Sequence, residues 1–372
     1  MSKKSINNRL ESLDALRGFD MFFITGGATL LCAIAALFPD SNVWQAIDEN
    51  MHHVPWDGLL HHDTIFPLFL FIAGISFPFS LEKQIEHGKS KASIYWKIVR
   101  RGLLLVLFGM IYNGMLKFEF DTLRWCSVLG RIGLAWMFAA LFFTATGKKL
   151  WPKIAVVPVI LIGYWLVSAF VHAPGVDPSI DPLTREGNIA CYIDRTLLGA
   201  HCYKPDYDPE GLLSTIPAIG TAMLGMLTGL FVKRSKPTCK MALALLVAGI
   251  VFALLGAAWN TIYPINKALW SSSFVLAVAG YSLVMFALFY YLIEVCGWRK
   301  WAFYFKVIGM NSILIYMAPK FIDFDKLNHS VFEGVFGLFP EQYYGVVESI
   351  GYLAVIWLFV YFMYRQRIFL KV

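Results

Sequence analysis

The chain has 372 residues, of which 58% are hydrophobic and only 15% are charged, and its mean hydropathy is +0.60. Soluble domains are only about 45–50% apolar, so this composition excludes an ordinary soluble enzyme and indicates a chain that a lipid bilayer solvates. The net charge of +7 requires no nucleic acid partner, because Lys and Arg gather at the cytoplasmic ends of membrane spans.

Apolar runs long enough to cross a bilayer recur along the whole chain. A spanning helix needs roughly 20 predominantly apolar residues, and about ten such runs are present, without an internal repeat or a soluble domain between them. We therefore predict an all-α, polytopic transmembrane helix bundle that forms a single domain over residues 1–372. The expected spans are 15–38, 63–81, 97–116, 125–146, 152–171, 212–232, 240–259, 270–293, 302–321 and 344–364.

The start of the chain does not resemble a cleavable signal peptide. Met1 to Leu10 is polar, and the apolar run that follows is long enough to span the membrane. The first run is therefore expected to remain as a membrane helix.

Lys and Arg alternate strictly between successive connections and so predict an orientation. Loop 39–62 contains Asp and Glu but no Lys or Arg, and loop 172–211 is likewise rich in acids. Both are expected to face outward, which in a bacterial inner membrane is the periplasm, and both termini are expected in the cytoplasm. The basic segments that define the other side are 3–9, 82–101, 148–149, 233–240, 299–306 and 365–371.

Two of the six cysteines, Cys191 and Cys202, lie in the same outward loop. Disulfides persist in oxidising compartments, so the placement of these two residues predicts a bridge between them.

The first outward loop carries four of the eight histidines immediately before an apolar run. Histidine is the usual residue for moving a proton near neutral pH, and an Asp at the start of a helix can orient an imidazole. The alternative is an interfacial turn in which Asp63 caps the helix. The polar residues of this segment are His52, His53, Trp56, Asp57, His61, His62 and Asp63.

The same histidines also allow a zinc site, because imidazoles and carboxylates are ordinary zinc ligands. However, His61 and His62 point in different directions on a helix, and no second His-rich helix supplies the other ligands. We therefore expect no metal.

Several polar residues fall inside expected spans, where a charge is costly and is a functional hypothesis by default. Asp14 and Arg17 have the i, i+3 spacing of an ion pair at a helix end. Arg131 lies about two turns inside a span, so it must find an internal partner or an anionic ligand, unless its side chain reaches the interface. Asn311 and Ser312 lie inside another span.

Six segments in this order resemble the heparan-α-glucosaminide N-acetyltransferase family of transmembrane acetyltransferases. Single matches of this length arise by chance, but six of them extend over nearly the whole chain and over both membrane faces. They are RLESLDALRGFDMF (9–22), HVPWDGLLHHDTIFPLFLFIAG (53–74), YIDRTLLG (192–199), DPEGLLSTIPAI (208–219), PINKALWSSSFVL (264–276) and GMNSILIY (309–316).

The resemblance implies a membrane enzyme that uses acetyl-CoA from the cytoplasm to acetylate a terminal glucosamine amine on the far side. It places His53 at the family's essential histidine and Asp63 at the acid beside it, and it implies a homodimer. His53 is then a general base in a ternary complex, which we favour, or an acetyl acceptor.

The remaining site residues are assigned by the side of the membrane on which they are expected. Polar and aromatic residues of the outward loops are assigned to the acceptor sugar: Trp56, Asp57, Asp194, Arg195 and Glu210. Cationic and neutral polar residues at helix ends or within spans are assigned to acetyl-CoA, each with ordinary helix-end charge or interhelical hydrogen bonding as its alternative: Arg17, Arg100, Arg101, Arg131, Lys267, Asn311 and Ser312.

Two other functions use the same residues. A sugar transporter would need the outward acids and aromatics but no chemistry, and it would commonly show paired repeats and broken helices, which the sequence pattern does not reveal. An O-acyltransferase of a cell-envelope glycan would need the same base and the same thioester.

Overall fold

The computed structural model describes residues 10–234 and 236–370. Four of the basic residues that predict the orientation lie outside these residues: Lys3, Lys4, Arg9 and Lys371. Within them every regular element is a helix, apart from two isolated β-bridges. The helices are α1 (Glu11–Phe22), α2 (Ala28–Ala35), α3 (Asn42–Asn50), α4 (His61–Glu86), α5 (Lys91–Tyr112), α6 (Val128–Ala145), α7 (Trp151–Phe170), α8 (Ile189–Leu197), α9 (Thr215–Val232), α10 (Cys239–Trp259), α11 (Ser272–Tyr290), α12 (Phe303–Met310), α13 (Ser312–Met317), α14 (Phe324–Phe336) and α15 (Tyr344–Arg365).

All ten expected spans coincide with helices, and among the described residues eight of the helices are long and apolar enough to cross a membrane. Two of the ten expected spans, 97–116 and 302–321, are not among these eight, each for its own reason. Helix α5 is 22 residues long, but its first half carries several charges. The run 302–321 is not one helix, because it breaks at Asn311 between α12 and α13. The fold is therefore the predicted all-α, multi-pass helix bundle.

The first span is also interrupted. Between α1 and α2 lies the π-helical segment η1 (Phe23–Gly27), in which Thr25 and Gly26 leave helical geometry. Gly26 has φ 124°, a conformation that residues with a side chain rarely adopt. The sequence reading missed both breaks because the hydrophobic pattern continues through them.

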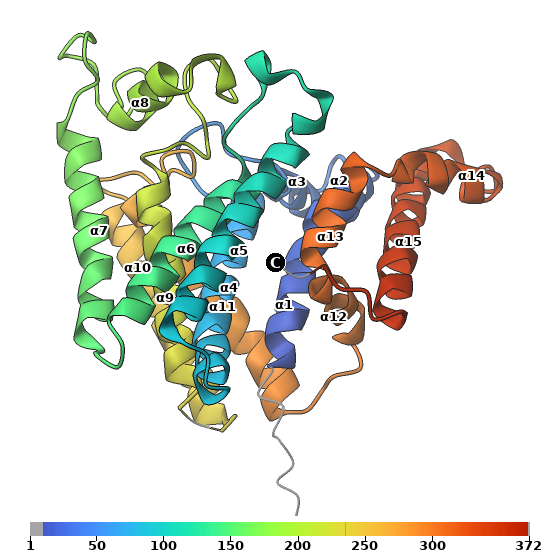
Figure 1. Cartoon of the computed structure of the whole chain (residues 1–372). Coiled ribbons are helices and arrows are strands. Elements are labelled where there is room, and N and C mark those ends of the chain that lie inside the picture. Colours follow the sequence, from blue (N-terminus) through green and yellow to red (C-terminus); the bar gives the residue numbers. More distant parts are fainter. Residues whose placement is uncertain (1–9, 235, 371–372) are drawn as a thin grey trace, which may run out of the picture.

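Helix α1, near the start of the chain, packs against α12, which comes much later in the sequence (Figure 1). A Cβ atom on Gly18 would lie 1.7 Å from the carbonyl oxygen of Phe305, and one on Gly309 would lie 1.9 Å from that of Asp14. Only glycine permits such a close approach of two helix backbones, which is a common device in membrane bundles.

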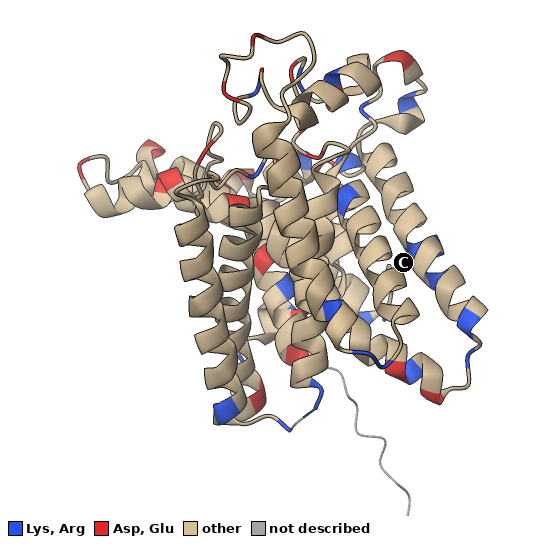
Figure 2. Cartoon of the chain, turned by 90° about the vertical axis from the view of Figure 1, so that its left-hand side faces the viewer, with Lys and Arg blue, Asp and Glu red and all other residues tan. Residues whose placement is uncertain are grey.

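The two predicted outward loops lie at one end of the bundle, where α3 and α8 are found, and the connections rich in Lys and Arg lie at the other end (Figure 1). Most charged residues lie toward the two ends, and the long helices are mainly uncharged between them (Figure 2). The structure thus agrees with the grouping of loops into two sets, and we call the end with α3 and α8 the outward end.

The predicted disulfide is wrong, because Cys191 and Cys202 are both free thiols. Cys191 is buried in an apolar cluster with Ala190, Tyr207 and Leu269. The Cys202 thiol instead donates to the backbone carbonyl of Asp194 at 3.3 Å. Burial raises the pKa of Cys191 to about 12 and that of Cys202 to about 11, so neither is a reactive thiolate.

Candidate active site

His53 and Asp63 meet at the outward end of α4, as the resemblance implied. Nδ1 of His53 lies 2.7 Å from Oδ1 of Asp63. The Asp63 side chain is only 1% exposed, whereas that of His53 is 54% exposed. Because the carboxylate can only accept, a hydrogen bond between the two requires the hydrogen on Nδ1, which leaves the lone pair of His53 on Nε2.

Asp63 also caps α4. Its Oδ2 accepts from the backbone N–H groups of Leu60 and Val54, both at 3.3 Å, so the carboxylate reaches back from the third helical position to the residue before the helix. Asp63 therefore caps α4 and contacts the His53 ring at the same time. The cap fixes the carboxylate, and the fixed carboxylate orients the ring.

Lys267 is the third member of this cluster. Its Nζ lies 3.2 Å from Oδ1 of Asp63 and 3.1 Å from Nδ1 of His53. Burial lowers the pKa of Lys267, while the attraction of Asp63 acts in the opposite direction. We had assigned Lys267 to acetyl-CoA, and the structure instead places it beside the histidine.

Two loops that are far apart in sequence bring Lys267 to His53. Asn266 donates from Nδ2 to Oδ1 of Asp57 at 3.1 Å, and Gly58 donates from its backbone to Ile265 at 2.8 Å. Gly58 has φ 125°, which suits glycine at this turn. Asp57 therefore ties the loop of His53 to that of Lys267, although its side chain remains exposed.

The other outward residues assigned to the sugar mainly hold the loops together. Trp56 donates from Nε1 to the carbonyl of Leu183 at 3.2 Å. Asp194 is buried and accepts from the backbone of Leu212 at 2.9 Å. Arg195 donates to two backbone carbonyls in the segment that precedes α8.

Glu210 belongs to an ion cluster that the sequence reading missed. Arg124 contacts Oδ2 of Asp208 at 2.9 Å through Nε, and its Nη2 contacts both Asp208 and Glu210. Both carboxylates are buried, and they raise the pKa of Arg124. The available signal was a cation in a short connection next to a span, together with an acid-rich loop elsewhere in the chain, but only the fold shows that they meet.

The side chain of Arg131 contacts groups inside the bundle. It donates to the carbonyl of Gly211 at 3.2 Å and to the hydroxyl of Ser214, and its guanidinium lies 5.1 Å from the centre of the Trp270 ring. The side chain is 2% exposed. These contacts hold Arg131 inside the bundle, while its buried Nε and Nη1 have no hydrogen-bond partner among the described residues.

A cavity of about 360 Å³ lies deeper in the bundle and brings together Arg17, Arg101 and Ser312. The guanidinium of Arg101 lies 4.3 Å from the centre of the Trp136 ring, and its buried Nε has no hydrogen-bond partner among the described residues. Arg100 is exposed and does not line the cavity.

A much smaller cavity of about 30 Å³ adjoins this one on the side of the outward end. The two share Phe69, Leu129, Ile132, Ser312 and Ile313, and the second also reaches Phe66 and Tyr316. Phe66 lies one helical turn beyond Asp63. The path from Ala73 in the deep cavity to Asp63 covers ten residues of α4, or roughly 15 Å.

The side-chain amide of Asn311 is already hydrogen-bonded to the backbone of two later residues, so it is not free to contact a molecule on this path. Its Nδ2 donates to the carbonyl of Ile368 at 3.0 Å, and its Oδ1 accepts from the backbone of Leu370 at 3.3 Å. The end of the chain thus returns into the bundle, and Phe369 and Leu370 line the deep cavity.

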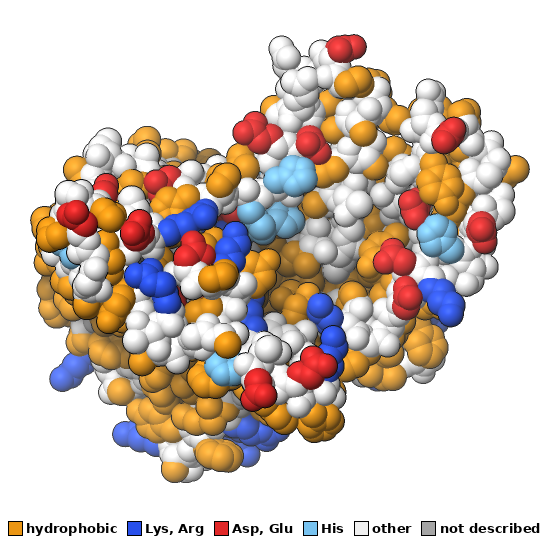
Figure 3. All heavy atoms as spheres, turned by 90° about the horizontal axis from the view of Figure 1, so that it is seen from above, with side chains coloured by type: hydrophobic (Ala, Val, Ile, Leu, Met, Phe, Trp, Pro, Cys, Tyr) orange, Lys and Arg blue, Asp and Glu red, His pale blue; other side chains and the backbone are white. Residues whose placement is uncertain are grey.

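From the outward end the molecule is hollowed near its centre (Figure 3). Histidine side chains gather on the rim of the hollow, with Lys and Arg beside them and hydrophobic side chains below. The fold and the site therefore define a polytopic helical membrane protein with a His–Asp–Lys cluster at one end and an arginine-lined cavity within.

Sequence comparisons support the resemblance to the acetyltransferase family. Residues 9–120 match a family model described as a domain of unknown function (DUF5009). The whole chain aligns at 27% identity with the heparan-α-glucosaminide N-acetyltransferase of Mus musculus, and 98% of it aligns at 28% identity with that of Homo sapiens. The chain spans 62% and 60% of the length of these two relatives.

Proposed function

We propose that this chain is a membrane-embedded acetyltransferase that moves an acetyl group from acetyl-CoA to the amine of a glucosamine-type sugar. The observation that carries the proposal is the pairing of an exposed His53 with a buried Asp63 at 2.7 Å. The names of the two relatives supply the reaction class, and the pairing supplies a positioned base for it.

In the proposed reaction His53 acts as the general base of a ternary complex. The amine attacks the thioester carbonyl and gives a proton to Nε2 of His53. The C–S bond breaks, and the departing sulfur takes that proton, so that amide and thiol are the products. Asp63 keeps the Nε2 lone pair available and stabilises the imidazolium. An acyl-imidazole at the same Nε2 is the alternative path.

The proposed route for the donor is the pair of connected cavities. Arg17 and Arg101 would face the phosphates of CoA, because guanidinium groups suit phosphate recognition. Ser312 lines both cavities and could hydrogen-bond the pantetheine arm. The roughly 15 Å from Ala73 to Asp63 is then the depth over which the arm carries the acetyl group.

The proposal includes an orientation and a location. The outward end would face the periplasm of a bacterial inner membrane, with both termini in the cytoplasm and acetyl-CoA arriving from that side. A homodimer and a single domain over 1–372 remain predictions. No contact of the described residues is assigned to a second copy.

The test is acetyl transfer by the purified full-length protein. Protein in lipid nanodiscs is incubated with acetyl-labelled CoA and with glucosamine, chitosan oligomers and neutral sugars. We expect label on the sugar nitrogen, and His53→Ala should lower the rate about 10²–10⁴-fold while leaving CoA binding intact. His172→Ala, an exposed histidine of the other outward loop, is the matched control. A His53→Ala rate near that of wild type would refute the mechanism, and label on oxygen would make the protein an O-acyltransferase.

One observation favours a sugar transporter as the second candidate. Transporters often carry broken helices near their binding sites, and the structure has two breaks, at Gly26 and at Asn311. Sugar uptake into proteoliposomes without any acetylated product would favour the transporter.

A further inference from the structure

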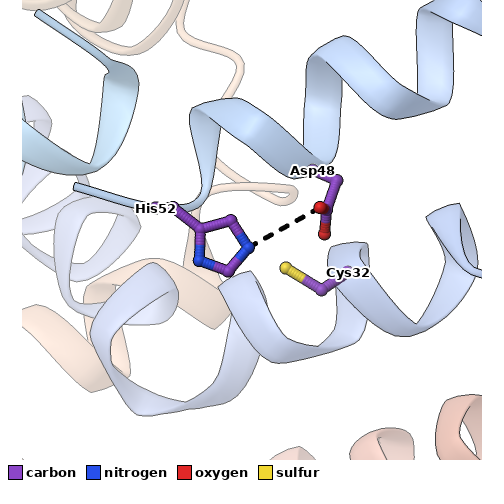
Figure 4. A group of neighbouring side chains, drawn as sticks. All are labelled: Cys32, Asp48 and His52. Atoms are coloured by element: carbon purple, nitrogen blue, oxygen red, sulfur yellow. Dashed lines mark ion pairs between the residues drawn. The ribbon is translucent and has the colours of Figure 1, made fainter. Parts of the chain in front are cut away.

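A cluster of possible metal ligands lies on the outward end apart from the His53–Asp63 pair. Cys32 of α2, Asp48 of α3 and His52, just after α3, point toward one another (Figure 4). Their thiol, carboxylate and imidazole ligand atoms all lie within 4.8 Å of one another. We propose that Cys32, Asp48 and His52 form a zinc site that joins α2 to α3.

The spacing of the ligand atoms fits this ion. Nε2 of His52 lies 3.6 Å from Oδ2 of Asp48. Zinc bonds of about 2.0–2.3 Å in a tetrahedral arrangement hold neighbouring ligand atoms roughly 3.5 Å apart, so the Asp–His pair already has the required separation. The ligand atoms lie within 4.8 Å of one another, so the sulfur of Cys32 needs to approach by at most about 1.3 Å.

The side chains have room for this movement. The side chains of His52 and Asp48 are 64% and 42% exposed, and Cys32 is half-buried. One sulfur, one nitrogen and one oxygen form a ligand set that suits zinc, and three protein ligands leave the fourth position for water. Without a metal, an i, i+4 ion pair joins Asp48 to His52 and a hydrogen bond joins the Cys32 thiol to Asp48. Zinc would replace both contacts by direct bonds from the three ligand atoms.

Helix α3 lies on the surface of the bundle, where Trp44 stacks on Phe38 and Asn50 accepts from the backbone of His61. None of its residues is buried. A hollow of about 720 Å³ lies between it and its neighbours, lined by α3 residues together with Phe23, Leu31 and His61. A metal ion shared by α2 and α3 would fix the end of α3, and it would fix His52 directly before His53.

The zinc site weighed from the sequence could draw on any of the four histidines of this loop, and the site proposed here uses only His52 of them, with Cys32 and Asp48. His61 and His62, whose ring nitrogens Nδ1 are buried without a partner among the described residues, are not part of it. Variants at the two places therefore distinguish the sites. The inference does not rest on the proposed acetyl transfer.

The first measurement is zinc binding. Purified full-length protein is stripped with a chelator and titrated with Zn²⁺ in competition with a chromophoric chelator. We expect one zinc ion per chain. Cys32→Ser and Asp48→Asn should each weaken binding at least tenfold, whereas Cys239→Ser, at an exposed cysteine elsewhere in the chain, should not. Absent binding, wild-type affinity in Cys32→Ser, or loss only in a His61→Ala, His62→Ala double variant would overturn the assignment.

The second measurement needs no variant and so does not depend on how the variants fold. The alkylation rate of each cysteine is followed by mass spectrometry with and without one equivalent of Zn²⁺. Alkylation of Cys32 should slow at least tenfold while that of Cys239 is unchanged. Equal rates at Cys32 in both conditions would also overturn the site.

Discussion

The side chain of Asp63 combines two tasks that are usually separate. It caps α4 through Oδ2 and holds both His53 and Lys267 at Oδ1. A single buried carboxylate thus links the start of a membrane helix to the residue proposed as the base. Its removal would therefore affect local geometry and charge together, and the choice of substitution matters.

We expect Asp63→Asn to lower the rate of acetyl transfer at least about 100-fold. The amide keeps an oxygen for the backbone donors but cannot stabilise an imidazolium. Steady-state kinetics should show the loss in kcat, with the KM for acetyl-CoA unchanged. Asp40→Asn, at an exposed acid of the same outward loop, is the control, and an equal loss in both variants would contradict the role of Asp63.

The buried Asp194 makes a prediction about pH. Burial raises its pKa from 3.8 to about 6, although the N–H of Leu212 acts in the opposite direction. Between pH 4 and pH 6 the folded state then binds more protons than the unfolded state, so this residue lowers the free energy of unfolding as the pH rises.

Asp194→Asn removes this effect. Thermal unfolding should show a gain over wild type of about 2–3 kcal/mol at pH 7.5, and the gain should vanish near pH 4. A difference from wild type that does not depend on pH would show that Asp194 does not titrate in this range.

At the scale of the element, two neighbouring arginines on one helix lie in different environments. Arg101 faces the deep cavity and the Trp136 ring, while Arg100 is exposed on α5. Both were assigned to CoA from the sequence, because a run of basic residues does not show which face of a helix is covered. The fold supplies a matched pair of positions for testing the donor site.

We expect Arg101→Met to raise the dissociation constant of CoA about tenfold, because a hydrogen bond to a charged group contributes about 1.5–3 kcal/mol. Arg100→Met should leave it nearly unchanged. Isothermal titration with CoA measures both. Equal weakening by the two variants would indicate a general effect of charge instead of contact at the cavity.

The helices also show which features of the fold could be predicted from the sequence. Hydrophobic runs located every spanning helix, because a bilayer leaves few alternatives to a helix for apolar segments of that length. The breaks at Gly26 and Asn311 could not be seen, since neither changes the hydrophobic pattern. The pairing of His53 with Asp63 was expected from the family resemblance, whereas Lys267 is brought to them by the Asp57–Asn266 contact, which no sequence pattern shows.

At the scale of the whole molecule, charge defines two ends. The loops with α3 and α8 lie together, opposite the connections rich in Lys and Arg. Geometry does not assign an end to a compartment, but the distribution of Lys and Arg predicts one.

Labelling of introduced cysteines tests the orientation. In a variant without native cysteines, Gln45→Cys and Ile180→Cys should react with an impermeant thiol reagent in intact cells. Ser90→Cys should react only after lysis. Labelling of Ser90→Cys in intact cells, or protection of the other two, would reverse the orientation.

The glycine contact between α1 and α12 also sets a time during synthesis before which the protein cannot finish folding. A ribosome adds about 5–20 residues per second, so α1 is made tens of seconds before the segment around Gly309 that it packs against. Until then the polar face of α1, with Asp14 and Arg17, lies in the membrane without this neighbour. The deep cavity closes later still, because Phe369 and Leu370 are made after all the other residues that line it. A stalled or truncated chain therefore inserts most of its helices and still lacks the cavity.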